Sequence, residues 1–176
     1  MIHVYTGDGK GKTTAAVGLA IRAIGNGFRV LFVQFIKGAH TGEIEIFQKF
    51  PELIEIYRCS TGFVYKTPEE SQMETVKECV KEIEKKLEKN TYDMVVFDEL
   101  SVALSIGLLS REDVERLIQL SKKAELIITG RNAPDWLIER ADLVTEMKKI
   151  KHYFDRGIKA RKGIEYWWIQ LWLSIY

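Results

Sequence analysis

The sequence has few cysteines, few prolines and no low-complexity linkers. It contains two cysteines and three prolines among 176 residues. Cys59 and Cys79 have no CxxC spacing, so neither a zinc site nor a disulfide framework is indicated. We therefore expect two reduced thiols in a cytosolic protein.

Charge of one sign and long apolar runs are also missing. Lys and Arg number 26 against 25 Asp and Glu, a net charge of +1. That balance gives no field to hold a polyanion, although a local basic patch is still possible. The longest apolar stretch, residues 166–176, contains Gln170 and Ser174 and falls short of the ~20 residues of a membrane span. We expect a cytoplasmic protein that binds neither nucleic acid nor a membrane.

The residues that are present suit one folded domain. With 46% hydrophobic and 29% charged residues, the chain buries a core and stays in solution. Short β-branched runs alternate with helical patterns, which predicts an α/β fold with a mostly parallel central sheet and helices on both faces. Expected strands are residues 2–5, 29–35, 54–57 (an edge or third strand), 92–97, 126–129 and 143–147 (the last core strand). Expected helices are residues 12–24, 112–121, 134–140 and one that starts at 68 and carries an apolar stripe to 87.

The strongest motif is the loop at residues 6–14, Thr-Gly-Asp-Gly-Lys-Gly-Lys-Thr-Thr, between the first strand and the first helix. Its three glycines let the backbone fold into a cup whose N–H groups point inward, beside a helix N-terminus that favours a phosphate. Lys12 reaches a phosphate oxygen, and Thr13 places its hydroxyl on a magnesium ion. The sequence therefore predicts a nucleotide-binding P-loop of the RecA-like kind.

This loop departs from the common pattern, which has four residues between its first glycine and the Gly-Lys pair. Counting from Gly7 leaves three, so the cup is one residue short, and hydrolysis at the γ-phosphate is not assumed. The helix that follows is apolar nearly all round and is expected to be buried. Its one internal charge, Arg22, either emerges at an exposed end or faces a bound anion.

Polar residues follow several strands, where ligands gather in such a sheet. Asp98 and Glu99 follow a buried strand and are placed to complete a magnesium shell with Thr13. Arg131 follows another strand and suits a phosphate. Phe63 and Tyr65 lie on a loop, and two aromatic rings near a nucleotide favour a flat ligand.

The chain resembles the P-loop-type corrinoid adenosyltransferases, the ATP:cob(I)alamin adenosyltransferases of bacterial cobalamin biosynthesis. The resemblance covers residues 1–166, and it rests on these motifs: 5–16 with the short loop, 33–38, 61–63, 96–100, 129–131, 151–160 and 163–166. It implies that cob(I)alamin attacks C5′ of ATP and expels triphosphate. It also implies an ATP bound in the opposite sense to other P-loop proteins, in agreement with the short cup.

Roles for individual residues come from the same resemblance. It implies that Arg22 and Arg131 help to hold the nucleotide, that Thr13 and Glu99 bind Mg²⁺ (or Mn²⁺), and that Phe63 and the residue two further on displace the lower ligand of the corrinoid. The triphosphate-binding residues are Gly7, Asp8, Gly9, Lys10, Gly11, Lys12, Thr13 and Thr14; the residues expected to act in catalysis are Lys12, Arg131, Phe63 and Tyr65. A homodimer and an electron donor such as a reduced flavoprotein are expected partners.

Two other functions remain open from the residues alone. A P-loop ATPase or nucleoside kinase would release ADP and phosphate, and a non-catalytic module would bind a corrinoid or nucleic acid without turnover. We expect residues 1–166 to form the adenosyltransferase domain and residues 167–176, with three of the four tryptophans, to pack on it or on a subunit interface. The tail pattern fits a strand or a helix. Some relatives carry an N-terminal segment over the active site, whereas this sequence starts at its first strand.

Overall fold

A computed structural model describes residues 1–36, 41–59 and 67–165. Within them, six parallel strands form one sheet in the order β3-β2-β4-β5-β1-β6. The strands are β1 (Ile2–Thr6), β2 (Val30–Gln34), β3 (Ile54–Arg58), β4 (Met94–Asp98), β5 (Glu125–Thr129) and β6 (Leu143–Glu146). Because every strand runs the same way, all six carboxyl ends lie at one edge of the sheet.

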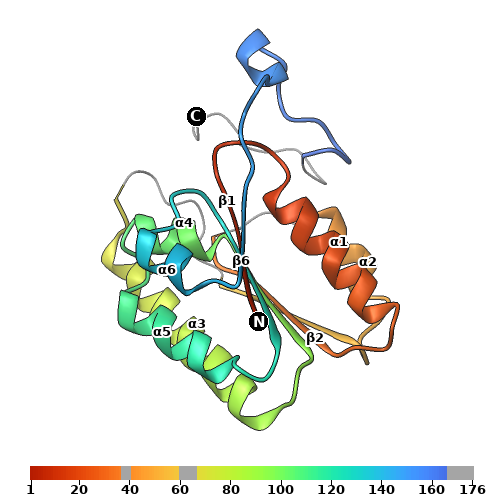
Figure 1. Ribbon diagram of the computed structural model, residues 1–176, viewed down its shortest axis with the longest axis vertical. Coiled ribbons are helices and arrows are strands. Elements are labelled where there is room, and N and C mark those ends of the chain that lie inside the picture. Colours follow the sequence, from red (N-terminus) through yellow and green to blue (C-terminus); the bar gives the residue numbers. More distant parts are fainter. Residues whose placement is uncertain (37–40, 60–66, 166–176) are drawn as a thin grey trace.

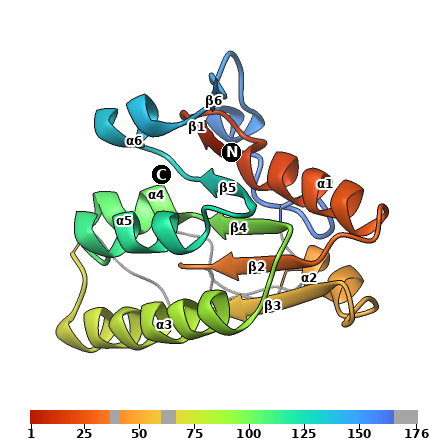
Figure 2. The same cartoon turned by 60° about the horizontal axis from the view of Figure 1, so that its bottom comes forward.

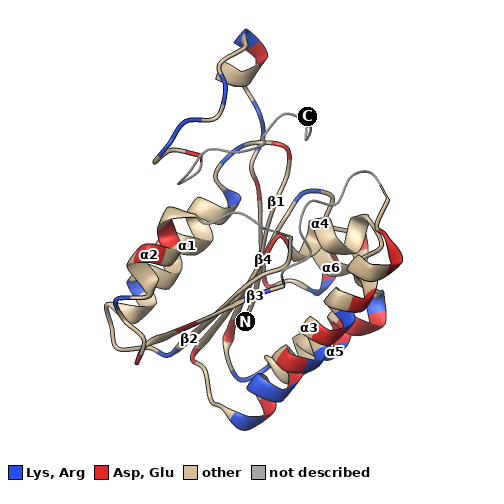
Figure 3. Ribbon diagram, turned by 180° about the vertical axis from the view of Figure 1, so that it is seen from behind, with Lys and Arg blue, Asp and Glu red and all other residues tan. Residues whose placement is uncertain are grey.

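Helices cover both faces of this sheet, which confirms the predicted α/β class (Figures 1 and 2). One face carries α1 (Lys12–Ile24) and α2 (Gly42–Phe47); the other carries α3 (Glu70–Lys89), α4 (Leu100–Ser105), α5 (Arg111–Leu120) and α6 (Asp135–Arg140). A 3-10 helix, η1 (Tyr153–Arg156), lies in the chain after β6. Lys, Arg, Asp and Glu residues are spread along α3 and α5 (Figure 3). No helix of the described residues is long and apolar enough to cross a membrane.

The protein has two hydrophobic cores, one on each face of the sheet, because successive side chains of a strand point to opposite faces. In β2, Leu31 and Val33 join the core beneath α3 and α5, whereas Phe32 joins the core beneath α1 and α2. Phe32 meets Phe47 there with ring centroids 5.2 Å apart. All five residues of β2 are buried, as its continuous apolar run predicts for a central parallel strand.

Two expectations about exposure are corrected, and the structure adds a helix. α1 buries only one side, and Ile21 is 47% exposed, because a single sheet face covers the helix. β6 is an edge strand with all four residues exposed, not a core strand, because it has a neighbour on one side only. α2 was not expected, since its six residues are too few for a helical period to stand out.

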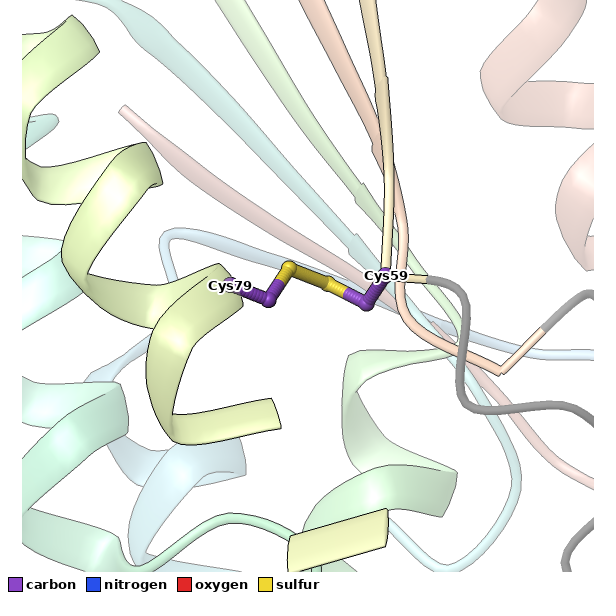
Figure 4. The surroundings of a disulfide bond; sticks show 2 residues. All are labelled: Cys59 and Cys79. Atoms are coloured by element: carbon purple, nitrogen blue, oxygen red, sulfur yellow. A yellow bond between two sulfur atoms is a disulfide. The ribbon is translucent and has the colours of Figure 1, made fainter. Parts of the chain in front are cut away.

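The two cysteines are joined, which corrects the expectation of free thiols. Cys59 directly follows β3 and forms a disulfide with Cys79 in α3, with Cα atoms 5.5 Å apart (Figure 4). Both residues are buried. The fold brings α3 across the end of β3 and so places the two thiols at bonding distance, which a sequence separation of 20 does not reveal.

Reduction of this disulfide is expected to lower the free energy of unfolding by about 3 kcal/mol, because a closed loop of this length restricts the unfolded chain by that amount. The urea midpoints of the native and the reduced protein, with thiols counted by mass spectrometry, measure the difference. Cys79→Ala serves as the control, because its midpoint should not respond to reductant. Equal midpoints for the native and the reduced wild type would contradict this expectation.

Candidate functional site

The ends of β4 and β5 meet the start of α1 around one buried carboxylate. The Asp98 Oδ1 atom accepts hydrogen bonds from the Thr13 hydroxyl at 2.8 Å and the Thr129 hydroxyl at 2.7 Å. The backbone N–H of Glu99 donates to the Thr129 hydroxyl oxygen at 3.0 Å. β5 lies between β4 and β1 in the sheet, so the Thr129 side chain is close to both the acidic pair and the phosphate loop.

Lys12 lies half-buried in the phosphate loop. Its Nζ donates to the carbonyl oxygens of Gly7 at 2.6 Å and Gly9 at 2.7 Å. Burial lowers the pKa of Lys12, the positive charge of Arg131 lowers it further, and the carboxylates of Asp8 and Glu99 oppose both effects. Arg131 and Glu99, in the turns that follow β5 and β4, therefore act electrostatically on Lys12. Their roles in a phosphate and magnesium site stay predictions.

The chain after β6 packs against the phosphate loop and explains two of its glycines. A Cβ on Gly9 would lie 2.5 Å from the Met147 carbonyl oxygen, and one on Gly7 would lie 2.6 Å from the same atom. The N–H of Gly9 donates to this oxygen at 2.5 Å. The expectation that the loop N–H groups point into the cup is therefore wrong for Gly9, whose N–H is directed toward Met147.

Unusual backbone conformations mark the acidic and arginine-bearing turns. Glu99 has a left-handed φ of 61°, and Asn132 has a φ of 55°. Non-glycine residues in this region are strained, and such residues cluster at functional sites. Gly130, with a φ of 145°, lies so close to α4 that a Cβ would be 2.8 Å from the Ser101 Cβ. This close approach fixes the turn that carries Arg131.

The structure brings together most of the predicted site residues. The phosphate loop, Glu99 and Arg131 share the carboxyl edge of the sheet. Arg22 lies exposed in the last turn of α1, ten residues beyond Lys12 and so about 15 Å along the helix. Phe63 and Tyr65 lie outside the described residues. The assigned roles of these three residues, like those of the loop residues, Glu99 and Arg131, stay predictions.

The sequence offers Asp98 and Glu99 together as candidates for the magnesium shell, and the structure adds that Asp98 accepts a hydrogen bond from the Thr13 hydroxyl. Thr129 has no predicted role of its own, yet its hydroxyl also donates to Asp98. Nothing in the sequence indicates a role for Met147, because it contacts Gly7 and Gly9 through its backbone and not through its side chain.

The site offers oxygen ligands rather than a cluster of metal-binding side chains. Among the described residues no group of three or more His, Cys, Asp or Glu gathers as a metal site. Mg²⁺ in nucleotide sites is held by one or two protein oxygens together with phosphates and water. The Thr13 hydroxyl and the neighbouring carboxylates of Asp98 and Glu99 are donors of this kind, so the residues present fit Mg²⁺.

A parallel sheet with a glycine-rich loop before α1 and a buried Asp near its Thr defines a P-loop nucleotide-binding protein. The fold agrees with the flagellar accessory protein FlaH of Methanocaldococcus jannaschii, with a TM-score of 0.50 and 14% identity over 82% of this chain and 69% of that one. The chain belongs to the ATP:corrinoid adenosyltransferase family BtuR/CobO/CobP, whose model matches residues 1–166.

Curated relatives agree with this membership. The corrinoid adenosyltransferase of Pseudomonas aeruginosa is 40% identical over 170 residues, which cover 94% of this chain and 83% of that protein. The corrinoid adenosyltransferase of Escherichia coli K12 is 40% identical over 169 residues, which cover 94% and 85%.

Proposed function

We propose that this protein transfers the 5′-deoxyadenosyl group of ATP to the Co(I) centre of a reduced corrinoid and releases triphosphate. The observation that carries the proposal is the short phosphate loop, with Lys12 inside it, in a chain whose family model matches residues 1–166. In this reaction a Co–C bond forms, the bond from C5′ to the phosphate oxygen breaks, and the electron pair of that bond leaves with triphosphate.

The protein supplies alignment and charge stabilisation, because cobalt itself is the nucleophile. The loop residues 7–14 and Arg131 face the triphosphate, whose negative charge grows as it leaves. Arg22 holds another part of the nucleotide. Thr13 and Glu99 hold Mg²⁺, and Asp98 orients the Thr13 hydroxyl through their hydrogen bond. When bound, Mg²⁺ neutralises charge on the phosphates.

Anaerobic incubation with ATP, Mg²⁺ and chemically reduced cobalamin tests the proposal. The expected products are a light-sensitive carbon–cobalt compound and one triphosphate per adenosyl group. Release of ADP and phosphate, independent of corrinoid, would instead identify an ATPase or kinase. Binding of ATP or corrinoid without either product would identify a non-catalytic module.

Phe63 is proposed to help remove the lower ligand of the corrinoid, which makes Co(II) easier to reduce. Phe63→Ala is therefore expected to slow adenosylation that starts from Co(II) more than adenosylation of chemically prepared Co(I). Parallel anaerobic assays with the two starting oxidation states measure the ratio. Equal losses in both assays would contradict the special role of Phe63, and Tyr65→Phe tests whether the neighbouring ring needs its hydroxyl.

The remaining partners are proposed from the family and the chemistry. Supply of Co(I) calls for an electron donor such as a reduced flavoprotein. Use of ATP supports a cytoplasmic location. A homodimer is supported by the exposed edge strand β6, where Leu143 and Val144 are 40% and 41% exposed, since such edges are templates for pairing. We also propose residues 1–166 as the adenosyltransferase domain, with residues 167–176, outside the described part, as an extension.

A further inference from the structure

Four side chains join the phosphate loop to the chain that follows β6. Lys10 Nζ donates to the Tyr153 hydroxyl at 2.8 Å and to Glu165 Oε1 at 2.6 Å. The Tyr153 hydroxyl donates to the same Glu165 oxygen. The backbone N–H of Arg161 donates to Glu165 Oε2 at 2.7 Å, and the guanidinium carbon of Arg161 lies 4.6 Å from the centroid of the Tyr153 ring. We call these four residues the clasp.

The clasp joins two segments that are far apart in sequence. Residues 148–165, the C-terminal arm, leave β6 beside the phosphate loop, extend beyond the sheet and return toward the start of α1 (Figure 1). Most of the arm is exposed. Lys10 and Glu165 are 155 positions apart, so their ion pair is a tertiary contact at the returning end of the arm.

The clasp contains two positive side chains, Lys10 and Arg161, and one negative side chain, Glu165. Its net positive charge attracts a further anion. The single carboxylate of Glu165 accepts from the ammonium of Lys10 and lies 3.4 Å from the guanidinium nitrogen of Arg161. The Glu165 side chain is 18% exposed, whereas that of Lys10 is 39% exposed. Lys10 is therefore accessible to a second anion while its present partner is largely withdrawn from water.

We propose that Glu165 is a positioning residue for the phosphate loop, and that it occupies Lys10 until a triphosphate takes its place. The inference rests on the proposed function, which makes Lys10 a ligand of the triphosphate. A carboxylate oxygen and a phosphate oxygen both accept from an ammonium group, so Lys10 serves one anion or the other. Triphosphate binding thus detaches Lys10 from the arm, and the arm in turn weakens triphosphate binding.

A zero-length carbodiimide crosslink on the wild-type protein tests the exchange. The reagent joins a contacting carboxylate and amine, so a Lys10–Glu165 crosslinked peptide is expected. Saturating tripolyphosphate should lower its yield about fivefold by mass action, and adenosine should not. The Lys149–Asp155 pair of the same arm, at 3.1 Å, is the internal control and should change less than about twofold.

Calorimetric titration with tripolyphosphate gives the second measurement. Glu165→Gln removes the competing charge and is expected to bind tripolyphosphate about fivefold more tightly. Asp155→Asn makes the same charge change on the arm without touching Lys10, and its affinity should stay near that of the wild type. In a Lys10→Met background, Glu165→Gln should have no effect, because the residue for which the two anions compete is gone.

The outcomes separate this inference from the assignment of the loop. The exchange alone would be overturned if tripolyphosphate bound but left the yield of the Lys10–Glu165 crosslink unchanged. It would also be overturned if Glu165→Gln and Asp155→Asn had equal effects on the affinity for tripolyphosphate. Failure of tripolyphosphate to bind the wild-type protein would overturn both the exchange and the role of the loop.

Discussion

Replacing Lys12 with alanine is expected to lower the turnover of adenosyl transfer by about 100-fold or more, which corresponds to about 2.7 kcal/mol of transition-state stabilisation. The Lys12 ammonium lies half-buried and bonded to two loop carbonyls, so it is held within the loop that we propose faces the leaving triphosphate. A charge-assisted hydrogen bond in such a place contributes more than one in water. Turnover is measured under anaerobic conditions with saturating ATP and Co(I) corrinoid.

Lys85→Ala is the matched control for the Lys12 variant. Lys85 lies on the exposed side of α3 and pairs with Glu82 at 2.5 Å, so its loss removes the same charge far from the loop and should leave turnover unchanged. Thermal unfolding checks that both variants fold. A folded Lys12→Ala protein with near-normal turnover would refute the role of the loop in charge stabilisation.

Asp98→Asn is expected to lower turnover by about 100-fold and to raise the Mg²⁺ concentration needed for half-maximal activity. The wild-type carboxylate is fully buried and accepts from two threonine hydroxyls. An amide keeps its shape but loses the charge that fixes the direction of the Thr13 hydroxyl and attracts a divalent cation. A Mg²⁺ titration of initial rates measures both effects.

Asp93→Asn provides the control for this second prediction. Asp93 directly precedes the same strand, at the opposite edge of the sheet, where its side chain accepts from the N–H of Arg29 at 2.8 Å. This variant removes one carboxylate next to β4 without a change at the site, so its Mg²⁺ dependence should match the wild type. An unchanged Mg²⁺ requirement in Asp98→Asn would show that Asp98 only supports the local fold.

Local patterns predicted most of the secondary structure. The helix at residues 12–24 was predicted with the observed ends of α1, because the glycine loop and the Gly25–Gly27 segment bound it. The stripe of apolar residues predicted for α3 is also confirmed, since Val76, Val80 and Ile83 are buried. Both signals depend on residues within a few turns of each other.

Predictions that depend on distant parts of the chain succeeded less often. The apolar run of β6 looks like that of a core strand, yet its place at the edge leaves it exposed. The sequence predicts that Asp98 and Glu99 act together with Thr13, but it does not predict the hydrogen bond from the Thr13 hydroxyl to Asp98. The disulfide between Cys59 and Cys79 depends on how α3 crosses the end of β3, which no spacing rule states.

The sequence by itself determined that this protein is an α/β protein with a short phosphate loop and the motifs of a corrinoid adenosyltransferase. Those features are local, because glycine positions, helix periods and strand ends are written in neighbouring residues. Only the tertiary structure decided which residues accept hydrogen bonds from the loop: Asp98 from Thr13, Met147 from Gly9, and Glu165 from Lys10. Strand order and the path of the arm set these contacts, and both result from packing of the whole chain.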